Sequence, residues 1–271
     1  MNRRRKLVAG VSIATIYLIL VVVLGSSLGE KAILTNFAIK NEPPSFRYLF
    51  GTDWMGRDML ARTLKGLSLS IIIGVGTAVI STVLALIMGI LAAVGGKKVD
   101  SVITFLIDIV LGIPHILLMI LISVAVGRGL TGVIVGVALT HWPSLARIIR
   151  AEILQLKEAP YIHIAEKLGH SKSYIVKKHI MPHLVPQVIV GTILIFPHAI
   201  LHEAAITFLG FGLSSGKPAI GIILSESMEH LMLGSWWTAF SPGIMLAFTV
   251  GMFYWLGDGI RKIIDPSTLH E

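Results

Sequence analysis

Histidine and carboxylate side chains set in long apolar runs are the groups in this sequence best suited to chemistry. His198 and His202 are four residues apart, so they share one face of a helix, and Glu203 follows directly. Two imidazoles at this spacing can bind a transition metal, and imidazole suits nickel. His115, beside Pro114, could join such a site or line a pathway. The alternative role for all of these side chains is packing or hydrogen bonding between helices.

Asp108 lies inside another apolar run, where an ionisable side chain is a functional candidate by default. Two arginines, Arg147 and Arg150, follow at the end of a later run. We therefore predict a structural ion pair between Asp108 and one of these arginines. A direct role of Asp108 in a pathway is the alternative.

The composition indicates a membrane protein rather than a soluble domain. Of the 271 residues, 54% are hydrophobic and 14% are charged, with a mean hydropathy of +0.82, whereas soluble domains carry about 25% charged residues. The net charge of +8 then indicates basic residues at the cytoplasmic surface, not a nucleic-acid partner. The sequence has no cysteine, which excludes disulfides, thiolate metal sites and cysteine nucleophiles.

Six apolar runs are candidate transmembrane helices. The first is expected to be an uncleaved span rather than a signal peptide, because it is about 20 residues long and no small-residue cleavage motif ends it. The fourth shows the weakest pattern, because His141, Trp142 and Pro143 interrupt it. The six runs are residues 7–28, 67–94, 102–126, 130–146, 185–209 and 240–256.

The distribution of Lys and Arg predicts the orientation. With the N-terminus in the cytoplasm, the inner segments hold most of the 23 Lys and Arg residues. Both termini and segment 158–186 are therefore expected to face the cytoplasm, and the loop 30–66 to face outside. In that loop the stretch GTDWMGRD predicts a turn that opens an interfacial helix, with Trp54 as an anchor. It could be a docking site for a binding protein or a structural lid.

The cytoplasmic segment is charged but compatible with two short helices. A first helix is expected over 161–168, ended by Gly169 in a left-handed turn, and Ser171 can cap a second one. The segment therefore predicts a helix–turn–helix hairpin. Two prolines are expected to end the second helix, Pro182 and Pro186.

A solvated basic loop would satisfy the charge rule equally well. Against it, apolar residues recur at helical spacing along the first helix, and such a stripe must pack against this protein or a partner. The stripe consists of Tyr161, Ile164, Ala165 and Leu168.

This segment resembles the cytoplasmic "EAA" loop of the permease subunits of ABC importers. In that motif a Gly lies six residues after a Glu, and a Leu-Pro pair follows twelve and thirteen residues after the Gly. Here Gly169 lies six residues after His163, and Pro182 lies thirteen after Gly169. The spacing is kept, while His163 and Met181 replace the family's Glu and Leu. The amino-acid sequence of this loop is most similar to that of the peptide/nickel branch of the family. The similar stretch is PYIHIAEKLGHSKSYIVKKHIMP.

The resemblance extends over nearly the whole chain. Each matching stretch is weak alone, but together, in order and at the family's spacing, they are specific. One departure is Ile220-Gly221, where the family usually shows Trp-Gly. The matching stretches are GTDWMGRDMLAR (51–62), Asp100, Asp108, Pro114, Trp142, Arg147, Arg150, Glu152, FLGFG (208–212) and GDGIRKIIDP (257–266).

The resemblance implies an all-α integral membrane protein of the type I ABC importer fold, with six transmembrane helices and a cytoplasmic helical coupling hairpin. Residues 1–66 would form an N-terminal transmembrane helix and outer segment. Residues 67–271 would form a five-helix permease core that contains the coupling loop 158–182. In such importers this loop sits in a groove of an ATPase subunit. The residues assigned to ATPase coupling are Glu158, Tyr161, His163, Ala165, Leu168, Gly169, Ser171, His179 and Pro182.

The chain is expected to bind no cofactor itself and not to be an enzyme. It has no Gly-x-x-x-x-Gly-Lys-[Ser/Thr] loop, so ATP and Mg should bind to partner subunits. The implied partners are a second homologous permease subunit in a heterodimer, two ATP-binding subunits, an extracytoplasmic substrate-binding protein and membrane lipid. The implied location is the plasma (inner) membrane of a bacterium or archaeon.

The cargo is expected to be nickel, free or chelated, ahead of short peptides, because few other polar groups lie at the depth of His198 and His202. His198 and His202 would be the metal ligands, and Glu203 and His115 would also line the pathway. Dipeptide or oligopeptide import is the alternative. A membrane-embedded metalloenzyme using these residues and His141 is a further alternative, although no HExxH or GxSxG motif is present. An ion channel would leave the hairpin unexplained.

Overall fold

The computed structural model describes residues 3–214 and 216–264, and within them the chain is helical, with an isolated bridge between Thr52 and Asp58 as its β structure. Asp265 and Pro266 of the last matching stretch lie outside the described residues. The helices are α1 (Arg3–Ser27), α2 (Met59–Val94), α3 (Lys97–Gly112), α4 (His115–Val126), α5 (Leu130–Lys157), α6 (Pro160–Lys167), α7 (Lys172–Ile175), α8 (Met181–Phe208), α9 (Ile220–Leu231) and α10 (Trp237–Ile264). Short 3-10 turns (Glu30–Ile33, Phe37–Ile39) and a π-helical turn (Val176–Ile180) complete the order.

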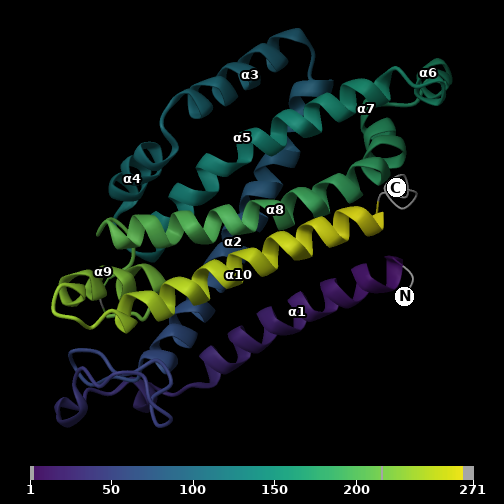
Figure 1. Ribbon diagram of the computed structural model, residues 1–271. Coiled ribbons are helices and arrows are strands. Elements are labelled where there is room, and N and C mark those ends of the chain that lie inside the picture. The colour runs from purple at the N-terminus through teal and green to yellow at the C-terminus, as the bar shows by residue number, and fades with distance from the viewer. Residues whose placement is uncertain (1–2, 215, 265–271) are drawn as a thin grey trace.

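Five helices are long and apolar enough to cross a membrane: α1, α2, α5, the continuous α7–α8, and α10. The sixth predicted span is the pair α3 and α4, whose axes differ by 101°. Figure 1 shows α3 beginning where α2 ends and α4 ending at the opposite end of the bundle, where α5 begins. The pair therefore crosses the bundle as one broken span, so the described residues contain six candidate crossings, as predicted.

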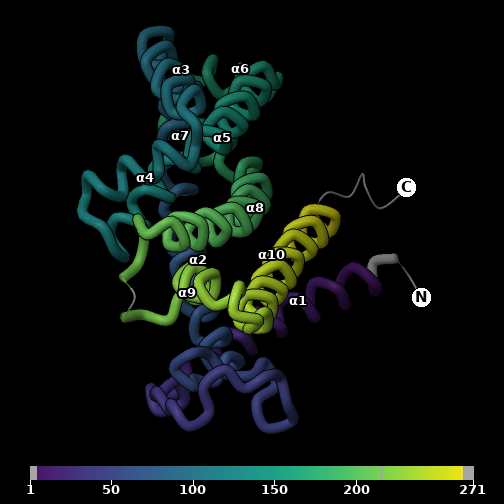
Figure 2. The backbone as a smooth tube through the Cα atoms, turned by 60° about the vertical axis from the view of Figure 1, so that its left-hand side comes forward, coloured from purple at the N-terminus to yellow at the C-terminus, as the bar shows by residue number. Residues whose placement is uncertain are grey.

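The helix ends fall into two groups (Figures 1 and 2). One end of the bundle carries α6, α7, the start of α1 and the end of α10, and we call it the hairpin end. The other end carries the segment between α1 and α2 together with α9, and we call it the far end. This grouping agrees with the prediction that the start of α1, the end of α10 and the hairpin lie on the same side of the membrane. That this side is the cytoplasmic side stays a prediction.

The break between α3 and α4 corrects the prediction of one helix over 102–126. Ile113 is extended, with φ −90° and ψ 137°, directly before Pro114. Proline disfavours the helical conformation in the residue before it and has no amide hydrogen to donate. The helix therefore ends at Gly112 and restarts at His115.

The fourth apolar run, residues 130–146, was expected to be interrupted at His141, Trp142 and Pro143, but the helix is continuous there. Helix α5 passes through Pro143 as one 28-residue helix. Trp142 and Pro143 are both buried, and Trp142 belongs to a core cluster with Leu145 and Ala146. Packing on this face compensates for the hydrogen bond that Pro143 cannot make.

The prediction that Pro182 and Pro186 end the second hairpin helix is also wrong. Helix α7, the π-helical turn and α8 form one continuous helical stretch from Lys172 to Phe208. Pro182 is the second residue of α8 and follows the π-helical turn directly, so within the continuous stretch it leaves one backbone carbonyl without its usual amide donor. The π-helical turn just before it shifts the hydrogen-bond register, so the helix continues into the span.

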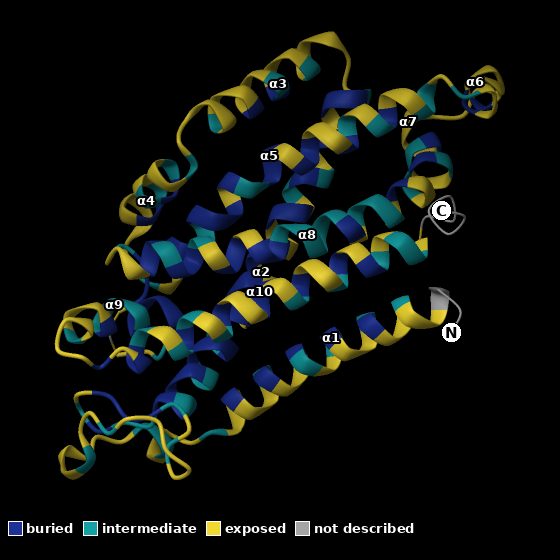
Figure 3. Cartoon of the chain, viewed as in Figure 1, coloured by how far each residue is buried: buried dark blue, intermediate teal, exposed yellow. Residues whose placement is uncertain are grey.

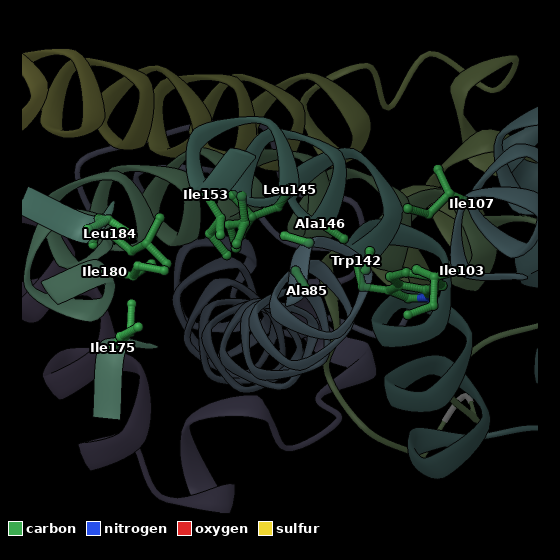
Figure 4. Packing of buried hydrophobic residues seen from close by; sticks show 14 of the residues in the cluster. Ala85, Ile103, Ile107, Trp142, Leu145, Ala146, Ile153, Ile175, Ile180 and Leu184 are labelled. Atoms are coloured by element: carbon green, nitrogen blue, oxygen red, sulfur yellow. The ribbon is translucent and has the colours of Figure 1, made fainter. Parts of the chain in front are cut away.

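The largest core cluster joins the hairpin to the bundle. Figure 4 shows Ile175, Ile180 and Leu184 beside the α5 side chains Leu145 and Ile153. Helix α2 approaches α5 closely at Gly89, where a Cβ atom would lie 2.8 Å from the Ile149 side chain. Small residues at such crossings allow close helix packing in lipid. The hairpin is thus connected to the transmembrane helices through packed apolar side chains.

Helix α1 packs on the same bundle. Leu18 and Val21 belong to one core cluster with Met59 of α2 and Phe253 of α10. The predicted division into 1–66 and 67–271 stays a prediction. Figure 3 shows exposed residues along the outer faces of α1, α3 and α4, as expected of apolar helices that face lipid or another subunit.

An ion-pair network holds the outer segment on the far end. Arg62 in α2 pairs with Asp53 at 2.6 Å and with Glu226 of α9 at 2.8 Å. Arg57 pairs with the same two carboxylates at 2.6 and 3.0 Å. The stretch GTDWMGRD forms the predicted turn, but the helix that it opens is the long span α2 rather than an interfacial helix. Its Asp58 side chain caps α2 by accepting from the Leu60 amide at 2.8 Å.

Aromatic side chains also hold the outer segment on the far end of the bundle. Trp54, expected as an interfacial anchor, stacks against His230 of α9 with ring centroids 5.4 Å apart. Trp237 at the start of α10 donates from Nε1 to the Thr52 carbonyl at 3.0 Å. The outer segment is therefore bound to α2, α9 and α10, as a structural lid would be, and a docking role stays a prediction.

Candidate functional site: a histidine-lined cavity and an exposed hairpin

A cavity of about 580 Å³ lies between α5 and α8. It follows α8 from Gln187, near the hairpin end, to His202, which is about 22 Å further along by helix rise. Arg261 of α10 lies on the wall as well. Most of the wall area is apolar, although about half of the lining residues carry a polar side chain. The residues that line it are Leu111, His115, Thr140, His141, Ser144, Leu145, Ile148, Gln187, Val190, Gly191, Leu194, Ile195, His198, His202 and Arg261.

Three histidines from three helices meet on the cavity wall. His115 begins α4, His141 lies midway along α5, and His202 lies in α8. Their ring centroids are 4.6 to 5.2 Å apart, and one ring nitrogen from each lies within 4.8 Å of the other two. All three side chains are half-buried. Imidazoles that converge in this way can hold a transition-metal ion.

The tautomer of His141 is fixed by the backbone of its own helix. Its Nδ1 lies 2.8 Å from the Val137 carbonyl oxygen, which can only accept, so Nδ1 carries the proton. The Nε2 atom is then left with its lone pair. It is buried and has no hydrogen-bond partner among the described residues.

The predicted pair of His198 and His202 is not the group that the structure brings together. His198 also lines the cavity, but it is exposed and its Nε2 lies 3.1 Å from the Tyr254 hydroxyl. His202 instead faces His115 and His141. A pattern of four residues on one helix could not show contributions from two other helices.

Glu203, expected on the pathway, does not line the cavity. Its side chain is fully buried, and Oε1 accepts a hydrogen bond from the Thr207 hydroxyl at 3.1 Å. Its neighbour His202 reaches the cavity, because adjacent residues on a helix point in different directions. The other carboxylate oxygen, Oε2, is buried and has no hydrogen-bond partner among the described residues, and a role of Glu203 in the pathway stays a prediction.

Both arginines of α5 form ion pairs with α3. Arg147 donates to Asp108 at 2.8 Å, which is the predicted pair, and the two side chains are 55% and 60% exposed. Arg150 donates two hydrogen bonds to Asp100, at 2.5 and 2.6 Å, from side chains that are each 28% exposed. The pairing of Arg150 with Asp100 was not predicted.

The hairpin forms with the predicted turn. Gly169 has φ +82°, and its amide donates to the Glu166 carbonyl at 2.9 Å. The next amide, of His170, donates to the Ala165 carbonyl at 3.2 Å, which completes a Schellman motif at the end of α6. Ser171 then caps α7 by accepting from the Tyr174 amide at 3.3 Å, as predicted.

The apolar stripe of α6 splits between two environments. Ala165, together with Ile162, is buried against the bundle. Tyr161, Ile164 and Leu168 remain exposed, and Leu168 is 71% exposed. Large apolar side chains grouped on a short exposed helix are typical of a surface that a partner covers.

The other residues assigned to coupling surround this surface. Glu158 directly follows α5 and is exposed. His163 is exposed on α6, with Nδ1 3.8 Å from the Glu166 carboxylate. His179 is half-buried in the π-helical turn, and Pro182 is exposed at the start of α8.

Residues 85–270 match the family described as "Binding-protein-dependent transport system inner membrane component". The match covers more than half of the chain. The chain belongs to this family. It is therefore a membrane-embedded permease subunit of a transport system, and the resemblance to ABC importer permeases is confirmed.

Relatives match this family member over most of its length. It is 31% identical over 265 residues to the dipeptide transport system permease protein DppC of Bacillus subtilis (strain 168), covering 97% of this chain and 83% of that protein. It is 35% identical over 254 residues to a putative peptide transport system permease protein of Brucella suis biovar 1 (strain 1330), covering 92% and 85%. It is 34% identical over 232 residues to the oligopeptide transport system permease protein OppC of Bacillus subtilis (strain 168), covering 86% and 76%.

A solved structure confirms the fold. A chain of the MetNI methionine ABC transporter in an inward-facing conformation superposes with a TM-score of 0.61 at 20% identity, covering 76% of this chain and 98% of that chain. Identity this low shows the fold alone. The permease thus has the expected type I ABC importer architecture.

Sequence reasoning missed several groups on the cavity wall of this permease. As a candidate site residue, His141 entered only through the metalloenzyme alternative. Gln187 and Ser144 were not singled out, and Arg261 appeared only within the matching stretch 257–266. A helical projection of α5 and α8 would have placed Ser144 and Gln187 as polar residues on apolar spans. No sequence pattern would have placed Arg261 of α10 beside them.

Proposed function

We propose that this chain is one permease subunit of an ABC importer that moves short peptides, dipeptides or oligopeptides, into the cytoplasm. The observation that carries the proposal is its similarity, at 31–35% identity over most of the chain, to permeases named for dipeptide, oligopeptide and peptide transport. The cavity supports it, because about 580 Å³ lies within the range of about 300–1,000 Å³ typical of small-molecule pockets. Mostly apolar walls suit a cargo with varied side chains.

The energy would come from separate ATP-binding subunits that bind the hairpin. The exposed Tyr161, Ile164 and Leu168 supply an apolar contact, and the core behind them leads into α5 and α8, which line the cavity. A force on the hairpin would therefore reach the cavity wall directly. Two such subunits, a second homologous permease and an extracytoplasmic binding protein complete the proposed assembly, with both termini in the cytoplasm.

Nickel was expected ahead of peptides from the sequence, and the comparisons reverse that order. The relatives described above are named for peptides, and the cavity is far wider than one ion requires. Nickel, free or chelated, becomes the second candidate. The observation that favours it is the convergence of three imidazoles on the wall.

The proposal is tested by uptake in the native host. Deleting the gene for this chain should abolish uptake of labelled di- and tripeptides, and the wild-type gene should restore it. Nickel uptake, measured in the same cells, should not change. Unchanged peptide uptake with loss of nickel uptake would instead favour the second candidate.

A cavity variant makes the same test specific to the pathway. Ser144 is exposed on α5 and lines the cavity, so Ser144→Trp should narrow it and reduce uptake of longer peptides before dipeptides. Leu139 is exposed on α5 outside the cavity, and Leu139→Trp is the matched control. Wild-type transport of all lengths by a correctly inserted Ser144→Trp protein would show that the cargo does not use this cavity.

A further inference from the structure

We propose that His115, His141 and His202 bind one divalent transition-metal ion, of the class that imidazole prefers (Zn²⁺, Ni²⁺ or Cu²⁺), on the wall of the cavity. The inference goes beyond peptide import and does not depend on which cargo is carried. Its basis is the convergence of three imidazoles from three helices, with one ring nitrogen from each lying within 4.8 Å of the other two. Three histidine ligands with a fourth position left open is an established arrangement for a bound transition metal.

The strongest single observation is the state of His141. Its Nδ1–H donates to the Val137 carbonyl at 2.8 Å, so Nε2 is the atom available as a ligand. Metal-bound histidines almost always donate their other ring nitrogen in this way, which fixes the tautomer and the ring orientation. A buried polar atom without a partner is rare in proteins and requires an explanation, and a metal ion supplies one.

The other two ligands can adjust to complete the site. Tetrahedral coordination with bonds of about 2.0–2.1 Å places ligand nitrogens about 3.4 Å apart, so the rings must turn inward from the observed spread of up to 4.8 Å. His115 and His202 have ring contacts but no hydrogen bond within the described part of the chain, so their rings can rotate without breaking a hydrogen bond.

The site would add a link between three helices that already share a buried cluster, in which Met119 of α4 packs with Val137 of α5 and Ala199 of α8. His115 is the first residue of α4, directly after the 101° break, and the other two ligands lie on α5 and α8. A bound ion would hold the start of α4 against the two helices that line the cavity. The open fourth position would face the cavity, where water or a donor atom of the cargo could occupy it.

Direct metal binding tests the inference. The intact complex is purified with a histidine-free tag, and Co²⁺ is titrated as a visible probe, with Zn²⁺ as a competitor. We expect one tetrahedral Co²⁺ per copy of this chain. His115→Asn and His202→Asn should each weaken it by at least about tenfold, since even loss of an outer-shell partner costs 10–100-fold.

His198→Asn is the matched control, because His198 lines the same cavity but contacts Tyr254 instead. This variant should bind Co²⁺ as the wild type does. X-ray absorption of the metal-loaded wild type provides a second measurement that needs no variant, and we expect three imidazole ligands. The inference fails if wild-type binding is absent, if the asparagine variants at 115 and 202 bind normally, or if fewer than three imidazoles are counted. Each of these results leaves peptide uptake, and hence the proposed function, untouched.

Discussion

At the scale of single residues, two acid–base pairs join α3 to α5 and differ in geometry. Asp100 receives two hydrogen bonds from Arg150, whereas Asp108 receives one from Arg147 in a more exposed position. We expect Asp100→Asn to lower the free energy of unfolding by about 1.5–3 kcal/mol, the range for a hydrogen bond between charged groups, and Asp108→Asn to lower it less. Thermal unfolding of the detergent-solubilised protein measures both.

Double-mutant cycles identify the partners. Arg150→Gln should recover part of the loss caused by Asp100→Asn, with a coupling of about 0.5–3 kcal/mol, whereas the crossed combination with Asp108→Asn should be additive. If Arg150→Gln couples as strongly to Asp108→Asn as to Asp100→Asn, the pairing of Arg150 with Asp100 is contradicted.

The chemistry-bearing residues could be predicted only in part. The ion pair between Asp108 and Arg147 was predicted correctly, because opposite charges at similar depth in a membrane have few other partners. His115 was expected as a possible partner of His202, but the complete three-histidine group depends on where α4 restarts after Pro114 and on the rotation of α5 relative to α8. Neither quantity is encoded in residue spacing along one helix.

At the scale of elements, the hairpin depends on the turn at Gly169. A Cβ atom there would meet nothing within 4 Å, so the cost of a substitution is the backbone strain at φ +82°. We expect Gly169→Val to distort the hairpin and to uncouple ATP hydrolysis from uptake while membrane insertion is kept, since the left-handed conformation costs about 1–2 kcal/mol for a residue with a side chain. ATPase and uptake assays on the same membranes measure the effect.

Two variants control for strain alone. Gly96, with φ +91° and open space around it, ends the loop between α2 and α3, so Gly96→Val imposes similar strain outside the hairpin and should leave coupling intact. Asn tolerates this conformation better than Val, so Gly169→Asn should retain much of the transport. Normal coupling in Gly169→Val, or equal uncoupling in Gly96→Val, would refute the role assigned to this turn.

The number of spans was predictable and their interruptions were not. Long apolar runs identify a span whatever it packs against. Proline, however, broke the third run at Pro114, yet was accommodated within α5 at Pro143 and at the start of α8 at Pro182. The outcome at each proline depends on neighbouring packing and hydrogen-bond register, which a single sequence does not display.

At the scale of the whole molecule, the hairpin, the core behind it and the cavity form one connected path. Ile175 and Ile180 of the hairpin region pack in the same cluster as Leu145, which also lines the cavity. This continuity is what a subunit that couples an ATPase to a transport pathway requires. The architecture followed from the sequence motifs, whereas the cargo did not, because a mostly apolar wall carries little chemical information about what passes it.

The most direct test of the central claim is reconstituted transport. The complex is purified through a tag on this chain and placed in proteoliposomes with Mg-ATP on the hairpin side, and with binding protein and labelled dipeptide or tripeptide on the other. We predict peptide accumulation on the hairpin side that requires ATP hydrolysis and is lost in Gly169→Val. No ATP-dependent accumulation by a complex that still hydrolyses ATP, or accumulation that proceeds without ATP, would contradict it.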